Sequence, residues 1–280
     1  MSSEIFKGTL LVCDMDGTLL NNNFEVSREN KEALEYFTKS GGMLAVATGR
    51  MEPSVKCYLE SIPINVPCIF YNGAVIYDLF NEKPLWHCCL DEQVSSVVKE
   101  LMQEFPKLGV EVFQDGKVYF LQENDVTTRH YKKEGFTPVF KSMDMIPRPW
   151  YKVLLAWEPE KLKLVEDFLS RRKGCYRSVY SEPQFLELLS PEASKGKALK
   201  ELIKIIGCSP LNVAAVGDNL NDLEMIKWAD ISVAVQNAHP ELKKAAQTIC
   251  CSNDEHVAVD VVKIIEDRIK QGIIGKNTGN

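Results

Sequence analysis

Residues 9–18 read TLLVCDMDGT, an apolar run that ends in two acidic side chains. The run Thr9–Cys13 contains no charged residue, which predicts a buried strand. Asp14 and Asp16 follow it directly, at the carboxyl end of the strand, where open α/β sheets bind their ligands. A polar turn alone would also place acids there. Two carboxylates directly after a buried strand favour a functional site over a turn.

Apolar segments alternate with amphipathic segments on both sides of this strand. One amphipathic segment follows Ser27, which can cap a helix that ends at Gly41 and Gly42. This alternation is typical of βαβ units, so we predict an α/β fold with a parallel sheet. The other expected strands lie at 43–47, 68–71, 211–216 and 231–235. Further helices are expected to begin at Pro53, Gly196, Leu220 and Glu255.

A different pattern interrupts the alternation in the middle of the chain. Residues 81–83 read as the turn of one hairpin, and Asp115-Gly116 is a two-residue turn of the type that joins antiparallel strands. A helix with apolar residues at 3.6-residue spacing lies between them. We therefore expect a separate α+β domain at 85–182, inserted into a core formed by 1–84 and 183–280. The strand Phe185–Leu189 is expected to lead back to this core.

The overall composition excludes several classes of protein. The chain has 280 residues, 45% of them hydrophobic, and a formal net charge of -6. This balance fits a globular protein and gives no general basic surface for nucleic acid or an anionic membrane. No apolar run approaches the ~20 residues that span a bilayer, and no signal peptide is recognisable, so we expect a cytoplasmic protein. The nine cysteines lack zinc-binding spacing.

A second polar motif, Thr48-Gly49-Arg50, follows the strand expected at 43–47. Its hydroxyl and amides should reach the same edge of the sheet as Asp14, where they can hold phosphate oxygens. A strand-to-helix turn would also explain the motif. Arg50 could either bind a ligand or form an ion pair.

A third polar motif, GDNLND at residues 217–222, ends another apolar strand and begins a helix. The N-terminus of a helix favours anions, and two Asp and two Asn within five residues exceed what helix capping needs. Close carboxylates repel one another, a cost that a divalent cation removes, and oxygen-only ligands favour Mg²⁺. Asp14 and Asp16 therefore predict a Mg²⁺ site. Asp14, at the end of the strand, is the expected nucleophile towards phosphorus.

Five short motifs, taken in order, resemble those of the haloacid dehalogenase superfamily, and within it the Cof-type phosphatases. Each motif is weak alone, but their order, their places at strand ends and the long insert between them are specific in combination. The resemblance spans essentially the whole chain. It implies a Rossmann-like core and an α/β cap of type IIB, matched by 85–182, that selects the substrate. The motifs are Asp14-x-Asp16-Gly-Thr-Leu, Thr48-Gly-Arg, Asn72-Gly-Ala, Ser194-Lys195-Gly and Gly-Asp218-x-x-Asn221-Asp222.

The resemblance also implies roles for the matched residues. Asp14 is implied as nucleophile and metal ligand, and Asp218 as a further metal ligand. Asp16 is implied to protonate the leaving oxygen and later to activate water, while its main-chain carbonyl binds the metal. The implied phosphate-binding residues are Met15, Thr48, Gly49, Lys195 and Asn221. The implied supporting residues are Asp222, Arg50 and Asn72.

The reaction and the substrate stay partly open at this point. We expect a phosphatase that acts on small phosphorylated metabolites, with sugar phosphates as the first candidates, and a monomer or weak homodimer. A sugar phosphomutase of the phosphomannomutase type and a non-catalytic metabolite-binding module are the alternatives. The module is disfavoured because binding phosphate alone would not require Asp16. Arg148, Trp150 and Tyr151 could line a pocket in the inserted domain, but such aromatic pairs more often belong to the core.

Overall fold

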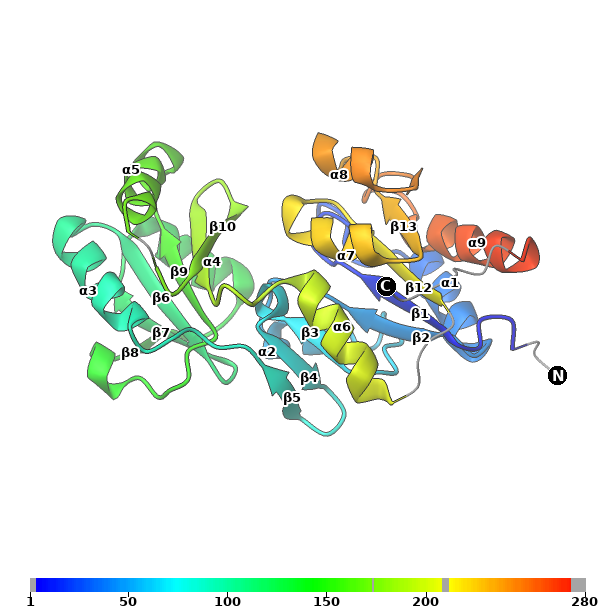
Figure 1. The fold of residues 1–280 in the computed structure, drawn as a ribbon, viewed down its shortest axis with the longest axis horizontal. Coiled ribbons are helices and arrows are strands. Elements are labelled where there is room, and N and C mark those ends of the chain that lie inside the picture. Colours follow the sequence, from blue (N-terminus) through cyan, green and yellow to red (C-terminus); the bar gives the residue numbers. More distant parts are fainter. Residues whose placement is uncertain (1–3, 173, 208–211, 273–280) are drawn as a thin grey trace. The chain divides into compact units, whose positions relative to one another are not determined.

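The computed structural model describes residues 4–172, 174–207 and 212–272. The chain divides into two compact units (Figure 1). The first unit contains the described residues of Met1–Thr48, Val55–Trp86 and Ser194–Asn280, and the second contains Gly49–Ser54 and His87–Ala193. The second unit thus differs from the expected insert at 85–182, because it begins at His87, continues to Ala193, and takes in a short segment from the first quarter of the chain.

A five-stranded parallel sheet forms the centre of the first unit, in the order β14-β13-β12-β1-β2. Strand β1 (Thr9–Cys13) lies between two neighbours, which explains why all five of its residues are buried. The predicted α/β class and parallel sheet are confirmed. The other strands are β2 (Met43–Val46), β12 (Asn212–Gly217), β13 (Ile231–Ala234) and β14 (Thr248–Ile249). Leu211, expected to begin a strand, lies outside the described residues.

The helices of the first unit follow the predicted alternation. Helix α1 begins after Ser27, whose hydroxyl accepts a hydrogen bond from the amide of Asn30, so the predicted N-cap is confirmed. Helix α1 packs against α9, and α6 packs against α7. The helices are α1 (Arg28–Lys39), α6 (Lys195–Ile206), α7 (Leu223–Trp228), α8 (Pro240–Ala245) and α9 (Val257–Lys270), and the short α2 (Glu52–Val55) joins the second unit to the first.

The third predicted strand does not join the parallel sheet. It forms β3 (Cys68–Phe70), which lies in a separate three-stranded sheet with β4 (Val75–Asp78) and β5 (Lys83–His87). Side chains occupy the amides that β2 would offer to a parallel partner: Asn65 Oδ1 accepts from Leu44 and Cys68 Sγ from Val46. Among the described residues, β3 pairs with the end of β2 only through the single parallel bridge between Ala47 and Ile69, so the expected assignment of this strand to the parallel sheet was wrong.

A mixed six-stranded sheet organises the second unit, in the order β10-β11-β9-β6-β7-β8. The predicted hairpin at Asp115-Gly116 is confirmed, and both residues have the positive φ that a two-residue turn of this kind requires. Phe185–Leu189 forms β11 of this sheet and pairs with β9 and β10, instead of leading back to the first unit. The other strands are β6 (Gly109–Gln114), β7 (Lys117–Gln122), β8 (Val139–Phe140), β9 (Lys152–Ala156) and β10 (Arg177–Glu182).

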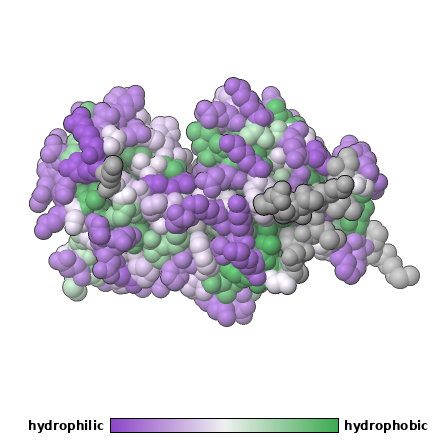
Figure 2. Space-filling view, viewed as in Figure 1, coloured by the Kyte–Doolittle hydropathy of each residue, from purple (hydrophilic) through white to green (hydrophobic). Residues whose placement is uncertain are grey.

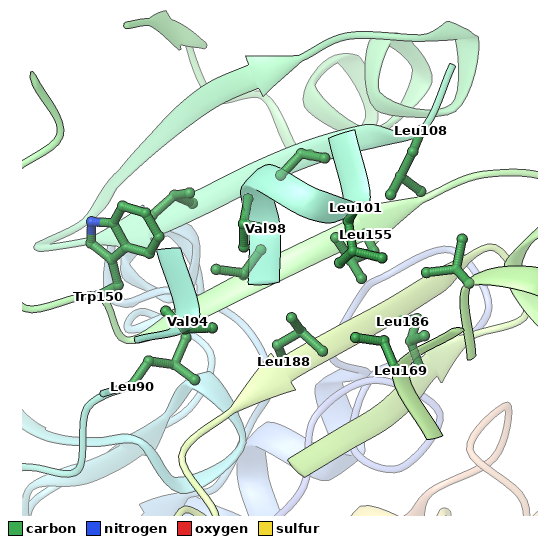
Figure 3. Packing of buried hydrophobic residues seen from close by; sticks show 14 of the residues in the cluster. Leu90, Val94, Val98, Leu101, Leu108, Trp150, Leu155, Leu169, Leu186 and Leu188 are labelled. Atoms are coloured by element: carbon green, nitrogen blue, oxygen red, sulfur yellow. The ribbon is translucent and has the colours of Figure 1, made fainter. Parts of the chain in front are cut away.

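The hydrophobic core of the second unit lies on one face of its sheet (Figure 3). Alternate strand residues such as Val112 and Leu155 pack there against α3 (Val94–Glu104) and α5 (Pro159–Ser170). Trp150 is fully buried in this cluster with the guanidinium of Arg148 3.6 Å above its ring, so it is a core residue. The strand residues between these, Glu111, Lys152 and Glu187, point to the opposite face, and helix α4 (Asp125–Glu134) contributes His130 there.

No described helix is long and apolar enough to cross a membrane. The molecular face drawn in Figure 2 mixes hydrophilic and hydrophobic residues.

Candidate active site

The carboxyl end of β1 holds the first acidic side chain of the site. Asp14 is 5% exposed, and its amide donates to the carbonyl of Val216 on β12. The hydroxyl of Thr18 donates to Asp14 Oδ2 (3.0 Å) and lies 3.3 Å from Asp218 Oδ1. Gly17 has φ +75°, and a Cβ there would lie 2.7 Å from Asp218 Oδ2. The turn after β1 therefore needs glycine to let the two acidic loops meet.

A buried lysine connects two of the carboxylates. Lys195, at the start of α6, is fully buried, and its Nζ lies 2.5 Å from Asp14 Oδ1 and 2.6 Å from Asp222 Oδ1. Burial lowers the pKa of Lys195, but the two carboxylates raise it by more, so the pKa lies above its ordinary value. A side chain at Gly73 would collide with the backbone of Ser194, the N-cap of α6. The close packing of the segment around Gly73 thus fixes the start of the helix that carries Lys195.

Asp222 fixes the loop after β12. Its Oδ1 binds Lys195, and its Oδ2 accepts from the amides of Asp218 (3.0 Å) and Asn219 (3.2 Å). The side chain is fully buried. Because both oxygens already have donors, Asp222 can orient Asp218 and Lys195, which fits the supporting role expected for it.

The three acids of the site form an uncompensated cluster. Carboxylate oxygens of Asp14, Asp218 and Asp222 lie within 4.8 Å of one another, and Asp16 is not part of this group. Burial, followed by the charge of Asp222, raises the pKa of Asp14 well above its ordinary value. The same two causes raise the pKa of Asp218 to about 6. A set of carboxylate oxygens with one lysine between them fits a hard divalent cation.

Thr48, Asn72 and Asn221 are brought together by hydrogen bonds. The amide of Asn72 donates to the carbonyl of Thr48 (3.0 Å), and Asn221 Nδ2 donates to Asn72 Oδ1 (2.9 Å). Asn72 adopts φ 54°, a left-handed conformation that Asn tolerates. Asn221 Oδ1 is buried and accepts no hydrogen bond from any described residue. A buried acceptor of this kind is suited to accept a hydrogen bond from a ligand or a water.

Met15 and Gly49 contribute their backbones. The side chain of Met15 is fully buried, so its main-chain amide is the group that it can offer to a ligand. Across the described part of the chain, the amides of Met15 and Gly49 donate no hydrogen bond. Asp16 is half-buried, and its backbone bridges to Leu20.

Arg50 forms an ion pair within the second unit. Its Nη1 lies 3.5 Å from Glu134 Oε2 at the end of α4, and both side chains are largely buried. The carbonyl of Gly49 accepts from Lys152 Nζ at 3.2 Å, also within the second unit. Of the two roles that the sequence left open for Arg50, the structure shows the ion pair.

Two residues after β13 also contact the site, although no motif in the sequence indicated them. Asn237 Nδ2 donates to the carbonyl of Gly17 (2.8 Å), and the amide of His239 donates to the carbonyl of Asp218 (2.7 Å). These bonds hold the two acidic loops from the side of β13. The polar residues directly after the predicted strand at 231–235 could have identified them, by the argument that identified Asp14.

A hollow of about 420 Å³ lies within the second unit, apart from the predicted site residues. Helix α4, the beginning of α5 and the turn between β10 and β11 form its walls. Its lining includes Arg129, His130 and Phe185.

Comparisons with known proteins agree with this geometry. The model of the haloacid dehalogenase-like hydrolase family matches residues 11–262. The chain belongs to the haloacid dehalogenase-like hydrolases.

Curated relatives and a solved structure place the chain more closely within the haloacid dehalogenase-like hydrolases. YxeH of Bacillus subtilis is 32% identical, with 88% of this chain and 94% of that protein covered. Phosphatase YwpJ of B. subtilis is 30% identical, with 91% and 98% covered. A haloacid dehalogenase-like hydrolase from Bacteroides thetaiotaomicron superposes with a TM-score of 0.82 at 28% identity, covering 92% of this chain and 99% of that one. The protein is therefore a Cof-type phosphatase of this family and not the non-catalytic module that the sequence left open.

Hydrolases of this family generally use a divalent metal ion, and the acidic cluster provides suitable ligands for one.

Proposed function

We propose that the enzyme hydrolyses small phosphorylated metabolites, with sugar phosphates as the first candidates, by Mg²⁺-dependent transfer of the phosphoryl group to Asp14 and then to water. The observation that carries this proposal is the buried cluster at the end of β1, in which three carboxylates surround one lysine. Such an excess of negative charge is costly to bury unless a cation completes the site. A cation beside Asp14 also allows an anionic phosphate to approach it.

Asp14 is the proposed nucleophile. Lys195 and Thr18 contact its two carboxylate oxygens, at 2.5 and 3.0 Å, and so fix its orientation. Attack by a carboxylate oxygen forms a bond to phosphorus and breaks the bond from phosphorus to the leaving oxygen, which gives an aspartyl phosphate. Lys195 is suited to neutralise charge on the phosphoryl oxygens during this step.

The proposed metal ligands are the carboxylates of Asp14 and Asp218 and the main-chain carbonyl of Asp16. Asp222 is assigned a supporting role because its fully buried carboxylate accepts three hydrogen bonds, from Lys195 and from the amides of Asp218 and Asn219. When bound, Mg²⁺ supplies positive charge that offsets the phosphoryl oxygens. The oxygen-only ligands favour Mg²⁺ over softer metals.

Asp16 is the proposed general acid and base. It follows the nucleophile by two residues, and its carboxylate is separate from the acidic cluster. In the first step its proton would pass to the leaving oxygen, and in the second step its carboxylate would take a proton from the attacking water. A carboxylate tied to a cation would be poorly suited to this exchange of protons.

The proposed phosphate contacts come from three loops and from the first residue of α6. The hydroxyl of Thr48, the amides of Met15 and Gly49, the side chain of Asn221 and Lys195 are assigned to the phosphoryl oxygens. The two amides have no acceptor among the described residues, which supports their assignment.

The proposed substrate class is supported by the name of one relative, and we assign the choice among substrates to the inserted segment. YwtE of B. subtilis, 27% identical to this chain, is named for 5-amino-6-(5-phospho-D-ribitylamino)uracil, a phosphate ester on a sugar-derived chain. We assign selection among such esters to the inserted segment, predicted at 85–182, because the matched motif residues lie outside it. A screen of phosphorylated metabolites measures this preference directly.

Trapping of the covalent intermediate tests the mechanism. Acid quench during turnover followed by borohydride reduction converts an aspartyl phosphate to homoserine, which peptide mass spectrometry locates. With p-nitrophenyl phosphate as the substrate, we expect homoserine at position 14 in the wild type and more of it in Asp16→Asn, whose second step is slowed more than its first. Asp14→Asn provides the blank. Turnover without any modified residue 14 would contradict the covalent mechanism.

A further inference from the structure

The second unit contains a hollow to which the proposed reaction assigns no part. Its volume is about 420 Å³, within the range of about 300–1,000 Å³ that small-molecule sites occupy. Helix α4, the beginning of α5 and the turn between β10 and β11 form its walls. Every lining residue belongs to the second unit, so the hollow is complete within that unit.

Two rings that their neighbours hold in place form a buried part of the lining. The centres of the His130 and Phe185 rings lie 4.8 Å apart, and both side chains are largely buried. His130 Nδ1 lies 2.8 Å from Oε2 of the fully buried Glu111. In the part of the chain that the structure describes, His130 Nε2 has no hydrogen-bond partner. The lining therefore offers an aromatic surface and one available ring nitrogen, in positions that are set before a ligand binds.

The charged side chains around the hollow are balanced in number, but they do not all form pairs. Lys133 Nζ lies 3.0 Å from Glu182 Oε1, and Gln184 Nε2 donates to Glu182 Oε2 at 2.6 Å. Arg129 and Glu158 also line the hollow, and neither side chain forms a hydrogen bond or an ion pair with any residue that the structure describes. The hollow thus presents one unpaired cation and one unpaired anion.

This charge pattern distinguishes between classes of ligand. A phosphate or another polyanion would be attracted by Arg129 but repelled by Glu158, and a simple cation would meet the reverse. A zwitterion satisfies both residues, because its carboxylate can accept paired hydrogen bonds from the guanidinium while its ammonium contacts the glutamate. An α-amino acid carries both charges on one carbon atom and leaves its side chain free to contact the aromatic surface.

We propose that the hollow is a binding site for a free α-amino acid with an apolar side chain. Arg129 binds the carboxylate and Glu158 the ammonium, while Phe185 and Val126 contact the side chain. His130 Nε2 has a partner in either protonation state, because a neutral imidazole accepts from the ammonium and an imidazolium donates to the carboxylate. This ligand is not the phosphorylated substrate, so the inference goes beyond the proposed function and gives the second unit a ligand of its own.

Isothermal titration calorimetry on the full-length protein with Mg²⁺ tests the class of ligand. The probe is L-phenylalanine, and two controls each lack one charge: 3-phenylpropionate has no ammonium, and phenethylamine has no carboxylate. We expect one L-phenylalanine per chain, and each control should bind at least about fivefold more weakly, equivalent to about 1 kcal/mol. A loss of this size is expected for one contact between charges at a partly exposed site. L-Phenylalanine should also raise the melting temperature, because it binds only the folded protein.

Two variants connect each charge of the ligand to one residue. Arg129→Gln should remove the advantage of L-phenylalanine over phenethylamine, because the carboxylate has lost its partner. Glu158→Gln should remove its advantage over 3-phenylpropionate, because the ammonium has lost its partner. Lys132→Gln on α4 and Glu160→Gln on α5 are the matched controls, since both positions are exposed and neither lines the hollow. All four substitutions are on the surface, and a melting curve for each variant checks that it is folded.

Three results would overturn the inference. The first is the absence of saturable binding for both L-phenylalanine and L-leucine up to about 10 mM. The second is equal binding of L-phenylalanine and its two controls, or losses in the matched control variants as large as those in Arg129→Gln and Glu158→Gln. The third is displacement of the amino acid by inorganic phosphate, which would assign its binding to the phosphate site. None of these measurements depends on hydrolysis, so failure of this inference is distinct from failure of the proposed function.

Discussion

The two units bury their charged side chains in opposite ways. In the first unit, Asp14, Asp218 and Asp222 gather around the single Lys195 at the end of a parallel sheet. In the second unit, each described carboxylate that is buried on the sheet face opposite the core has a lysine or imidazole partner. These pairs are Lys152 with Glu187 and Glu111 with His130.

This difference in charge balance distinguishes a ligand site in the first unit from a structural element in the second. A matched pair satisfies itself and fixes the backbone around it, whereas an unmatched set of acids stores an electrostatic cost that a cation or a proton relieves. The pKa values follow this division only in part. Burial raises the pKa of Glu111 as it does for the acids of the first unit, and His130 and Lys152 offset only part of this increase.

Asp14→Asn should give the largest effect. The amide keeps the volume of the side chain but is a poor nucleophile, so we expect kcat to fall by more than about 10⁴-fold, as for nucleophiles elsewhere. Steady-state hydrolysis of p-nitrophenyl phosphate and a circular dichroism spectrum measure loss of activity and retention of the fold. Activity within tenfold of the wild type would show that the unmatched cluster is not the reaction centre.

Asp16→Asn should give the next largest effect. General acid and base catalysis is worth about 10²–10⁴-fold, so hydrolysis of a sugar phosphate is expected to fall by an amount in this range. p-Nitrophenyl phosphate has a good leaving group and needs little protonation, so its first step should suffer less. Single-turnover kinetics on both esters measure this step. Equal losses on the two substrates would count against Asp16 as the acid.

The metal-free protein should become more stable as the pH falls from about 7 towards 5. Asp218 has a folded-state pKa of about 6 against an ordinary value of 3.8, so the folded protein takes up its proton before the unfolded chain does. The cost of the charged carboxylate is present above pH 6 and is relieved as the pH falls through this value. The whole shift corresponds to about 3 kcal/mol, of which about 1.4 kcal/mol is gained between pH 7 and pH 5.

Urea unfolding with a chelator at pH 7 and pH 5, for the wild type and Asp218→Asn, tests this sign. The variant lacks the titrating carboxylate, so the wild type should gain stability relative to it on acidification. Saturating Mg²⁺ should remove the difference, because the cation stabilises the charged form. Parallel pH profiles for the two proteins without metal would contradict the electrostatic account of the cluster.

Glu111→Gln should give the smallest effect on activity. It changes a matched pair of the second unit, so we expect kcat/KM on p-nitrophenyl phosphate to stay within about twofold and stability to change by less than about 2 kcal/mol. Asp222→Asn, in the unmatched cluster, is the informative counterpart and should lose far more activity. If Glu111→Gln lost as much activity, the distinction between the two kinds of buried charge would fail.

Sequence patterns were sufficient where a local rule determines the structure. The strand at Thr9–Cys13, the cap at Ser27 and the turn at Asp115-Gly116 depend on residues close together in the chain. The same holds for the convergence of Asp14 and Asp218, because carboxyl ends of parallel strands share one edge of the sheet.

The predictions were wrong or left open where a residue distant in the sequence determines which sheet a strand joins or which ion pair forms. Asn65 and Cys68 occupy the amides of β2 and so divert β3 into another sheet. The partner of Glu187 is 35 residues away at Lys152, and nothing in the apolar run Phe185–Leu189 indicates which sheet it joins. Arg50 finds Glu134 84 residues away. Such pairings follow from tertiary packing, which sequence periodicity does not encode.

The segment Gly49–Ser54 limits how freely this architecture can be recombined. In a protein with one simple inserted domain, the chain would pass between the units twice. This chain passes between them two further times, between residues 48 and 49 and between residues 54 and 55. A chimera that exchanges only His87–Ala193 for the corresponding part of a relative would place a foreign sheet beside the native Gly49, Arg50 and Pro53. Specificity grafts should therefore work best when residues 49–54 are exchanged together with the larger segment. Natural sequence changes in the two segments are expected to occur in concert, so that new substrate preferences evolve without loss of the phosphate loop.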